Sequence, residues 1–448
     1  MAPAEYDCGE AETVATMLAR MAGGFTDPVE LVQQSIDRAR EMNAHLNAFA
    51  TISVDGPVEA AKESRKRWEE QHARPLEGVP VAIKDLIDTA GIETRYGSAA
   101  YKGHVPLADA DVVGRLREHG AVIIGKTTTH EFAWGVTTSS NAFGDTRNPL
   151  DQTRIPGGSS GGAAVAIASG AVPAGLGTDT GGSIRIPASL CGVVGYKPTY
   201  GQFSTHGIFP LAPTLDHVGL MGRSVDDVAR LVQALGRCSS GGSTEPRFRV
   251  GIIRNIPPVP LEEGVARSFD HAVNMIASFH DVGEMSGGVF EGVFPAFAGL
   301  VLTEASVTHH RRNDRNTIAE KYEPETRERL SNAGAIKLEE YFAWQDFRRD
   351  FTARLQAFMN DVDFLILPTT PCVAPKIGQR RVEIESWSGT VREALMTYTA
   401  PFNMSGHPAI SIPLRVPPTC MPIGLQIVAG PHQDELLLRF AATLAQIV

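Results

Sequence analysis

The sequence predicts an α/β fold with a large, mixed and mostly buried β-sheet, helices on both of its faces, and a more variable helical region covering one face. Three observations predict it. Short β-branched runs alternate with helical patterns through the first half, charged helical segments dominate residues 257–391, and strand-like apolar runs return near the C-terminus. Strands that alternate with helices favour a sheet buried under helices on both sides.

The first elements are predicted to be helices. Asp27 is followed by Pro28 and by VELVQQSIDRAREMNAHLNAF, whose apolar residues recur at helical spacing. Aspartate is a favoured N-cap and proline fits the first helical position, so a helix is predicted from residue 28 to about residue 49. A second amphipathic helix is predicted over residues 58–71.

The pattern then changes to short apolar runs. The stretches VPVAIKDLID (79–88) and AVIIGKT (121–127) have the composition of buried strands, and ADVVGRLREHG before the second is a predicted helix ending at Gly120. Residues 161–169 are predicted to be helical. Two strand-like stretches, AVPAGLGTD and GVVGYKPTYG, follow this helix.

The second half is richer in long charged helices, such as TIAEKYEPETRERL and KLEEYFAWQDFRRDFTARLQAFMNDV. Strand signals return in FLILPTTP, PAISIPL and PIGLQIV, and DELLLRFAATLAQI is a predicted final helix. A chain of 448 residues exceeds the usual limit of roughly 250–300 residues for one core. We expect a single large domain over residues 1–448, with a core at about 75–225 and a helical covering region at about 257–391.

Composition excludes several classes of partner. The net charge of −10 disfavours nucleic acid and anionic lipid, and no uninterrupted apolar run reaches the roughly 20 residues that span a bilayer. The widely spaced cysteines, without a CxxC pair or zinc-like cluster, favour a reducing, cytoplasmic setting. These cysteines are Cys8, Cys191, Cys238, Cys372 and Cys420.

A glycine-rich stretch between Arg154 and Arg185 is the first candidate site. Asp179 is the only charged residue between those arginines, and Gly-Gly pairs adjoin its three candidate hydroxyls. The three hydroxyls belong to Ser159, Ser160 and Ser183. A serine hydroxyl is a weak nucleophile at neutral pH and requires a base.

Lys84 is the candidate base, because it follows Val-Ala-Ile in a predicted buried strand. Burial lowers the pKa of a lysine by disfavouring the ammonium form. Asp85 and Asp88 act in the opposite direction, since nearby carboxylates favour the charged form. The sequence leaves open which effect prevails, and chemistry alone does not choose between Ser159 and Ser160.

The segment Thr180-Gly181-Gly182-Ser183 has the composition of an oxyanion hole. Successive backbone N–H groups directed at one point stabilise the negative oxygen that develops during acyl transfer. Glycine permits the unusual backbone dihedral angles of such a turn and allows a substrate to approach closely.

Together these residues resemble the signature block of the amidase signature family of serine hydrolases. The resemblance rests on IPGGSSGGAAVAIASGAVPAGLGTDTGGSIRIPASLCGVVGYKPTYG, on VPVAIKD, on GKTTTHEFAWG and on GLQIVAG, and it extends from about residue 10 to the end. It implies the amidase signature fold and an acyl-enzyme mechanism that requires no metal or organic cofactor.

The resemblance also assigns roles to individual residues. Ser183 matches the acyl-forming nucleophile, Ser159 matches a bridging serine that follows a non-proline cis peptide, and Lys84 matches the general base. Supporting roles fall to Ser160, Asp179 and Arg185. The matching oxyanion-hole amides are those of Thr180, Gly181, Gly182 and Ser183.

The predicted function is hydrolysis of C–N bonds in small, largely apolar amides or carbamates, of the aryl amide or urethane type. Trp134, which aligns with a pocket position of the family, and Gly135 next to it suggest an apolar or aryl acyl group. We expect a cytoplasmic monomer or homodimer that acts on a small molecule. The alternatives are a component of an amidotransferase that releases ammonia from an amide donor within a complex, and a non-catalytic protein that retains the fold.

Overall fold

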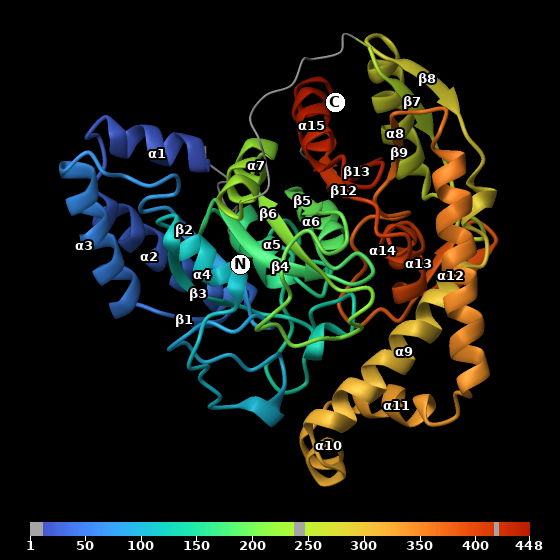
Figure 1. The fold of residues 1–448 in the computed structure, drawn as a ribbon, viewed down its shortest axis with the longest axis horizontal. Helices are drawn as coiled ribbons and strands as arrows, with labels where there is room; N and C mark the ends of the chain where they lie inside the picture. The colour runs from blue at the N-terminus through green and yellow to red at the C-terminus, as the bar shows by residue number, and fades with distance from the viewer. Residues whose placement is uncertain (1–11, 237–246, 416–420) are drawn as a thin grey trace.

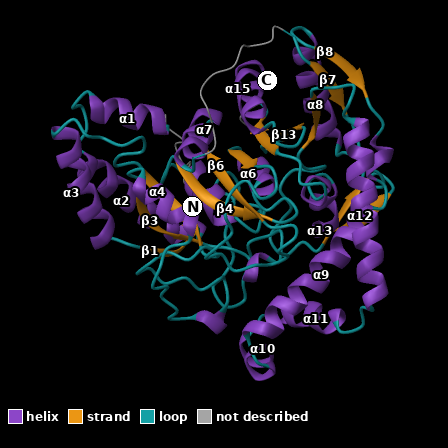
Figure 2. Ribbon diagram, viewed as in Figure 1, coloured by secondary structure: helices purple, strands orange, loops and turns teal. Residues whose placement is uncertain are grey.

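The computed structural model describes residues 12–236, 247–415 and 421–448, and its centre is a mixed β-sheet of 11 strands. The strand order is β1-β3-β2-β4-β6-β5-β12-β13-β9-β7-β8. Figure 2 shows helices on both sides of this sheet. The predicted fold class is therefore confirmed.

Parallel and antiparallel pairs both occur in the sheet. β2 runs parallel to β3 and β4, β7 runs parallel to β8 and β9, and the remaining neighbours are antiparallel. The strands are β1 (Phe49–Ile52), β2 (Pro80–Lys84), β3 (Val122–Thr127), β4 (Ala174–Asp179), β5 (Val194–Lys197), β6 (His217–Gly222), β7 (Arg249–Ile252), β8 (Asp281–Glu284), β9 (Phe364–Pro368), β12 (Ala409–Pro413) and β13 (Gly424–Ala429). A separate antiparallel hairpin is formed by β10 (Arg381–Ile384) and β11 (Trp387–Thr390).

Helices cover the sheet in two layers (Figure 1). They are α1 (Val14–Ala22), α2 (Pro28–Leu46), α3 (Asp55–Glu69), α4 (Asp111–Glu118), α5 (Gly161–Ala168), α6 (Arg185–Cys191), α7 (Val225–Ala234), α8 (Glu263–Ala277), α9 (Val293–Arg312), α10 (Arg315–Lys321), α11 (Pro324–Ala333), α12 (Leu338–Phe358), α13 (Val391–Thr397), α14 (Pro401–Met404) and α15 (Asp434–Ile447). Short 3₁₀ turns lie at Ala99–Tyr101, Glu131–Ala133 and Gly287–Phe290.

The alternating direction of side chains along each strand explains why helices cover both faces of the sheet. On β2, Val81 and Ile83 belong to the hydrophobic cluster that includes α4, α7, α8 and α15, whereas Ala82 belongs to the cluster that includes α2 and α5. Successive side chains of a strand point to opposite faces, so a strand that is apolar throughout is covered on both sides. All five residues of β2 are buried accordingly.

The strand register brings the candidate residues together. β2 and β4 run parallel with Ile83 opposite Leu176, so both strands end at the same edge of the sheet. Lys84 is the last residue of β2, and Asp179 is the last residue of β4. α5 begins immediately after the two adjacent serines, and α6 begins two residues after Ser183.

Residues 257–391 contribute more than helices. Strands β8 and β9 of this region extend the main sheet, and α9 and α12 lie side by side across one flank of the molecule (Figure 1). The segment Gly287–Arg312 averages a hydropathy of 1.3 over its most apolar window, enough by length and composition to cross a membrane. Half of that window is buried inside the protein, which is typical of a core helix.

Several predicted boundaries differ from those observed. The helix predicted to reach residue 49 ends at Leu46, because Asn47 adopts a left-handed conformation (φ 49°) and Phe49 begins β1. The charged stretch TIAEKYEPETRERL forms two helices rather than one, since Pro324 begins α11. Three of the cysteines, Cys8, Cys238 and Cys420, lie outside the described residues, and the other two are buried and unpaired.

Candidate active site

Lys84 is fully buried at the end of β2. Its Nζ lies 2.8 Å from Ser159 Oγ and 2.7 Å from Thr178 Oγ1. Burial lowers the pKa of Lys84 to about 7, against the opposing charges of Asp179 and Asp216. A substantial fraction of the amine is therefore neutral at physiological pH.

The expectation that Asp85 and Asp88 oppose the neutral amine is wrong. The opposing carboxylates are those of Asp179 and Asp216. Asp85 lies near a different lysine: burial raises the pKa of Asp85 to about 6, against the opposing charge of Lys126. The two lysines of this region therefore have separate carboxylate neighbours.

The two adjacent serines make different contacts. Ser159 Oγ accepts from Lys84, whereas Ser160 Oγ donates to the backbone oxygen of Thr178 at 3.2 Å. The peptide bond between Gly158 and Ser159 is cis, the conformation that the family resemblance implies at this position. Lys84 therefore contacts Ser159 and not Ser160, a choice that the sequence left open.

Ser183 lies in a neighbouring loop that contacts the first. The Ser160 N–H donates to the backbone oxygen of Ser183 at 3.2 Å, which joins the two serine-bearing turns. Ser183 itself is 5% exposed and lines a pocket. Within the described chain, its hydroxyl forms no hydrogen bond, which leaves it available to a molecule in the pocket.

Both glycines before Ser183 occupy positions with no room for a side chain. A Cβ on Gly181 would lie 2.3 Å from both Met396 Cε and Phe297 Cζ. Gly182 has a φ of +128°, and a Cβ there would lie 2.1 Å from Thr399 Oγ1. Only glycine combines this backbone conformation with such close packing.

Four backbone amides were predicted to form the oxyanion hole. In the structure one of them is already hydrogen-bonded, and three have no acceptor among the described residues. The Gly182 N–H donates to Asp179 Oδ1 at 2.7 Å, so this amide is already engaged. The N–H groups of Thr180, Gly181 and Ser183 have no acceptor among residues 12–236, 247–415 and 421–448. These three are the candidate donors toward a bound oxygen atom.

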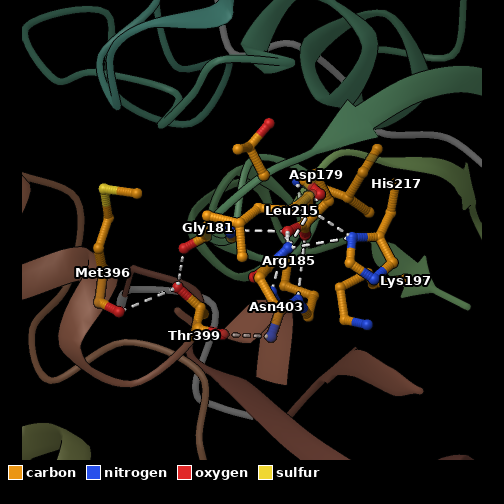
Figure 3. Close-up of polar contacts among 12 residues, drawn as sticks. Asp179, Gly181, Arg185, Lys197, Leu215, His217, Met396, Thr399 and Asn403 are labelled. Atoms are coloured by element: carbon orange, nitrogen blue, oxygen red, sulfur yellow. Dashed lines mark hydrogen bonds and ion pairs between the residues drawn. The ribbon is translucent and has the colours of Figure 1, made fainter. Parts of the chain in front are cut away.

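Asp179 and Arg185 form a buried ion pair behind the loop (Figure 3). Arg185 Nη2 lies 2.9 Å from Asp179 Oδ1, and Nε lies 3.0 Å from Oδ2. Burial raises the pKa of Asp179, but the charge and hydrogen bonds of Arg185 exceed that effect and hold it well below its usual range. The carboxylate is thus fixed as an acceptor for the loop.

The remaining donors of Arg185 reach segments far away in the sequence. They contact the backbone oxygen of Thr399 at 2.9 Å, Gln426 Oε1 at 2.7 Å and Asn403 Oδ1 at 2.6 Å. All five N–H donors of the guanidinium therefore have acceptors. Asn403 also donates to Asp179 Oδ1 at 2.9 Å, which closes the network in Figure 3.

Sequence reasoning missed several of these partners. Thr178 follows Lys84 by 94 residues, and Thr180 Oγ1 donates to Asp216 at 2.6 Å. Asn403 and Gln426 are also absent from the predicted site. Thr178 and Gln426 stand in motifs that carry the resemblance, and Asn403 stands in none of them. No local pattern shows their contacts, because their proximity arises from the order of strands in the sheet.

A narrow pocket adjoins Ser183, and its cavity volume is about 10 Å³, room for a single water molecule. Most of its walls are apolar, and they come from five separate parts of the chain. The lining residues are Ala133, Trp134, Gly135, Val136, Thr180, Gly181, Ser183, Leu211, Phe297, Val301, Arg392 and Met396. Trp134 and Gly135 were predicted here, whereas the residues of α9 and α13 were not.

Trp134 is held in place by its neighbours. Its ring stacks on His309 at a centroid distance of 5.8 Å, and Arg329 lies over it at 5.6 Å. A Cβ on Gly135 would lie 2.4 Å from the ring of His130, so this glycine permits close packing. Both residues therefore have structural contacts as well as a face toward the pocket.

A phosphate-loop pattern outside the candidate site forms part of the sheet. The stretch GAVIIGKT at residues 120–127 has the spacing of a phosphate-binding loop. Its residues from Val122 onward form the buried strand β3, and Lys126 Nζ is bound by Ile87, Thr89 and Thr94. A phosphate loop requires a free turn ahead of a helix, so this segment is a structural part of the sheet.

Comparison with known proteins gives the family. A family model described as Amidase matches residues 30–438. The glutamyl-tRNA(Gln) amidotransferase A subunit of Symbiobacterium thermophilum is 34% identical over 464 residues, which cover 93% of each chain. The AtzE subunit of 1-carboxybiuret hydrolase from Pseudomonas sp. is 33% identical and covers 95% of this chain and 96% of its own.

Solved structures agree with these relatives. A crystal structure described as an amidase superposes with a TM-score of 0.89 at 34% identity, and the match covers 98% of this chain and all of the other. The similarity thus includes the sheet, both helical layers and the region 257–391.

Proposed function

The chain belongs to the amidase signature family of C–N bond hydrolases, and on that premise we propose that it hydrolyses a small amide donor as one component of a complex. Both relatives described above are named as subunits, and one of them belongs to an amidotransferase. That kinship supports the complex over the free monomer or homodimer that the sequence suggested.

The contact between Lys84 and Ser159 carries the chemical part of the proposal. Neutral Lys84 accepts the proton of Ser159 Oγ while Ser159 Oγ accepts the proton of Ser183 Oγ. The Ser183 oxygen then attacks the amide carbon and forms the tetrahedral intermediate. Its negative oxygen is stabilised by the N–H groups of Thr180, Gly181 and Ser183.

Collapse of the intermediate reverses the proton transfers. The proton on Lys84 passes through Ser159 to the leaving nitrogen, the C–N bond breaks, and ammonia or an amine departs. Water then attacks the acyl-enzyme with Lys84 and Ser159 again as the base. The acid product leaves, and Ser183 recovers its proton.

A second function is favoured by the apolar pocket walls. Trp134, Phe297 and Val301 surround the site beside Ser183, which suits a small apolar amide or carbamate. In that case the chain acts as the monomer or homodimer that the sequence suggested.

The experiment compares the isolated chain with the assembly recovered through a tagged chain from its native cells. Each preparation is assayed with glutamine, a nitroanilide and an aryl carbamate, with Ser183→Ala as the matched control. We expect ammonia release from glutamine chiefly by the assembly, abolished in the control. Efficient cleavage of the nitroanilide or carbamate by the isolated chain, without glutamine hydrolysis, supports the second function instead.

A further inference from the structure

We propose that Asp216 is a positioning residue for the reaction, because its single carboxylate joins the Thr180 side of the oxyanion turn to the Leu211 wall of the pocket. The inference deepens the proposed function and rests on its premise that Ser183 is the nucleophile. Asp216 comes directly before β6, outside the glycine-rich stretch that marked the candidate site.

The contacts of Asp216 connect two walls of the pocket. Thr180 Oγ1 donates to Asp216 Oδ1 at 2.6 Å. The Leu211 N–H donates to Oδ2 at 2.9 Å, and the Ala212 N lies 3.2 Å from Oδ1 and 3.1 Å from Oδ2. Thr180 and Leu211 both line the pocket beside Ser183. Loss of the carboxylate would therefore release both walls at once.

The Thr180 contact acts on the oxyanion turn. The Thr180 N–H is one of the three candidate donors, and a donor held in place stabilises a developing negative charge better than one that must reorient. Farther along the turn, the Gly182 N–H donates to Asp179 Oδ1 at 2.7 Å. A carboxylate therefore holds the turn on each side of Gly181.

The two carboxylates differ in their counter-charge. Asp179 forms an ion pair with Arg185 at 2.9 Å. The donors to Asp216 in the described parts of the chain are neutral, one hydroxyl and two backbone N–H groups. Burial lowers the pKa of Lys84 to about 7, and the charges of Asp179 and Asp216 oppose that effect. The residue that holds the turn thus also acts on the base.

Other charged groups near Asp216 leave its charge uncompensated. Burial raises the pKa of Asp216, and the charge of Glu304 on α9 adds to this effect against the neutral donors. Tyr200 also faces Asp216, and burial raises the pKa of its phenol, so it carries no charge at neutral pH. The cation of this cluster is Arg348 on α12, which donates to the backbone oxygen of Thr214 at 2.7 Å instead.

The test measures the reactivity of Ser183 without a substrate. Methanesulfonyl fluoride is a small electrophile: the serine oxygen attacks its sulfur, fluoride leaves, and the serine proton passes to the base. Mass spectrometry of peptides gives the second-order rate constant of labelling from pH 5 to pH 9. The full chain is used, recovered through its tag with any partner as described above. Because the sulfonyl oxygen also gains negative charge, labelling reports on the oxyanion donors as well as on Lys84.

Asp216→Asn removes the charge and keeps the size of the side chain. Since Asp216 favours the ammonium form of Lys84, the variant should lower the pKa of Lys84 and move the acidic limb of the profile about one unit to lower pH. On the plateau, labelling should be about tenfold slower, because the contact to Thr180 weakens and Lys84 becomes a weaker base.

A second variant tests the contact itself. Thr180→Val removes the hydroxyl and keeps the backbone N–H, so plateau labelling should be about tenfold slower with the acidic limb unmoved. Combined with Asp216→Asn, it should slow labelling by no more than about a further threefold, because both changes affect one contact. Asp216→Glu retains the charge and should leave the acidic limb in place.

Asp227→Asn on α7 is the matched control. Asp227 is buried and also accepts from two backbone N–H groups, those of Val14 and Ser224, where α7 packs against α1. Its variant should keep the wild-type rate and pH profile, whatever its stability. An unmoved acidic limb in a folded Asp216→Asn, or plateau labelling within about twofold of the wild type, overturns the inference. If that variant does not fold, Thr180→Val labelled at the wild-type rate overturns it.

The same measurement separates this inference from the proposed function. A wild type that is not labelled at Ser183 overturns the proposed function, and the role of Asp216 with it. A labelled wild type whose rate and pH profile are shared by Asp216→Asn overturns the role of Asp216 alone.

Discussion

At the scale of single residues, the protonation of Lys84 decides whether the site is reactive. Burial lowers the pKa of this lysine to about 7, while Asp179 and Asp216 keep it from falling further. A lysine with its ordinary pKa of about 10.4 would be almost fully charged at pH 7 and unable to accept a proton. The strand that buries Lys84 therefore also prepares it as a base.

Activity should follow the neutral fraction of Lys84. Below a pKa of about 7 the amine is protonated, so kcat/KM should fall roughly tenfold per pH unit and about 100-fold between its plateau and pH 5. A pH profile of kcat/KM measures this. A flat profile from pH 5 to pH 9 would exclude Lys84 as the base.

Replacing Lys84 with arginine separates its role as a proton acceptor from the effect of its positive charge. Lys84→Arg keeps a long cationic side chain that does not deprotonate, so the rate of acylation should drop by at least about 100-fold. Single-turnover kinetics measure acylation, and circular dichroism checks that the variant is folded. Near-normal acylation by a folded variant would contradict the proton relay.

At the scale of elements, the turn between β4 and α6 depends on glycine. Gly182→Ala should lower the free energy of unfolding by about 1–3 kcal/mol, because its φ is +128° and the new Cβ meets Thr399. Gly114→Ala on α4 is the matched control, since nothing lies within 4 Å of its Cβ position. Urea denaturation should show the control unchanged or stabilised by about 0.5–1 kcal/mol.

The two residues of the ion pair behind that turn should be energetically coupled. Asp179→Ala leaves Arg185 buried without its counter-charge, so it should cost about 3–5 kcal/mol of stability. Removing both charges in Asp179→Ala/Arg185→Met should cost less than the sum of the single changes. Strict additivity in urea denaturation would show that the two residues act independently.

At the scale of the whole molecule, the pocket is assembled from segments that are distant in the sequence. Short apolar runs predicted β2, β3 and β4, because buried strands require them. Strand β8 was missed, since it is an edge strand with four exposed residues and no alternating pattern. Helix α6 was missed because it has only seven residues and contains Pro187.

The sequence could predict those site residues that stand in a distinctive stretch of the chain. Ser159 and Ser183 lie in one glycine-rich stretch, and Lys84 stands in an apolar strand, so composition marked all three. Asn403 and Arg392 carry no such mark, and Thr178, although it lies in the same stretch, is not distinguished from its neighbours there. Their places depend on β2 lying beside β4 and on α13 packing against the Ser183 loop, which only the folded chain reveals.

The central claim is that Ser183 forms the acyl-enzyme, and rapid quenching followed by mass spectrometry of peptides tests it directly. During turnover of an amide substrate, we expect the acyl group on the peptide containing Ser183, and its absence in Ser183→Ala. An acyl group on Ser159 or Ser160 instead, or full turnover by Ser183→Ala, would contradict the assignment.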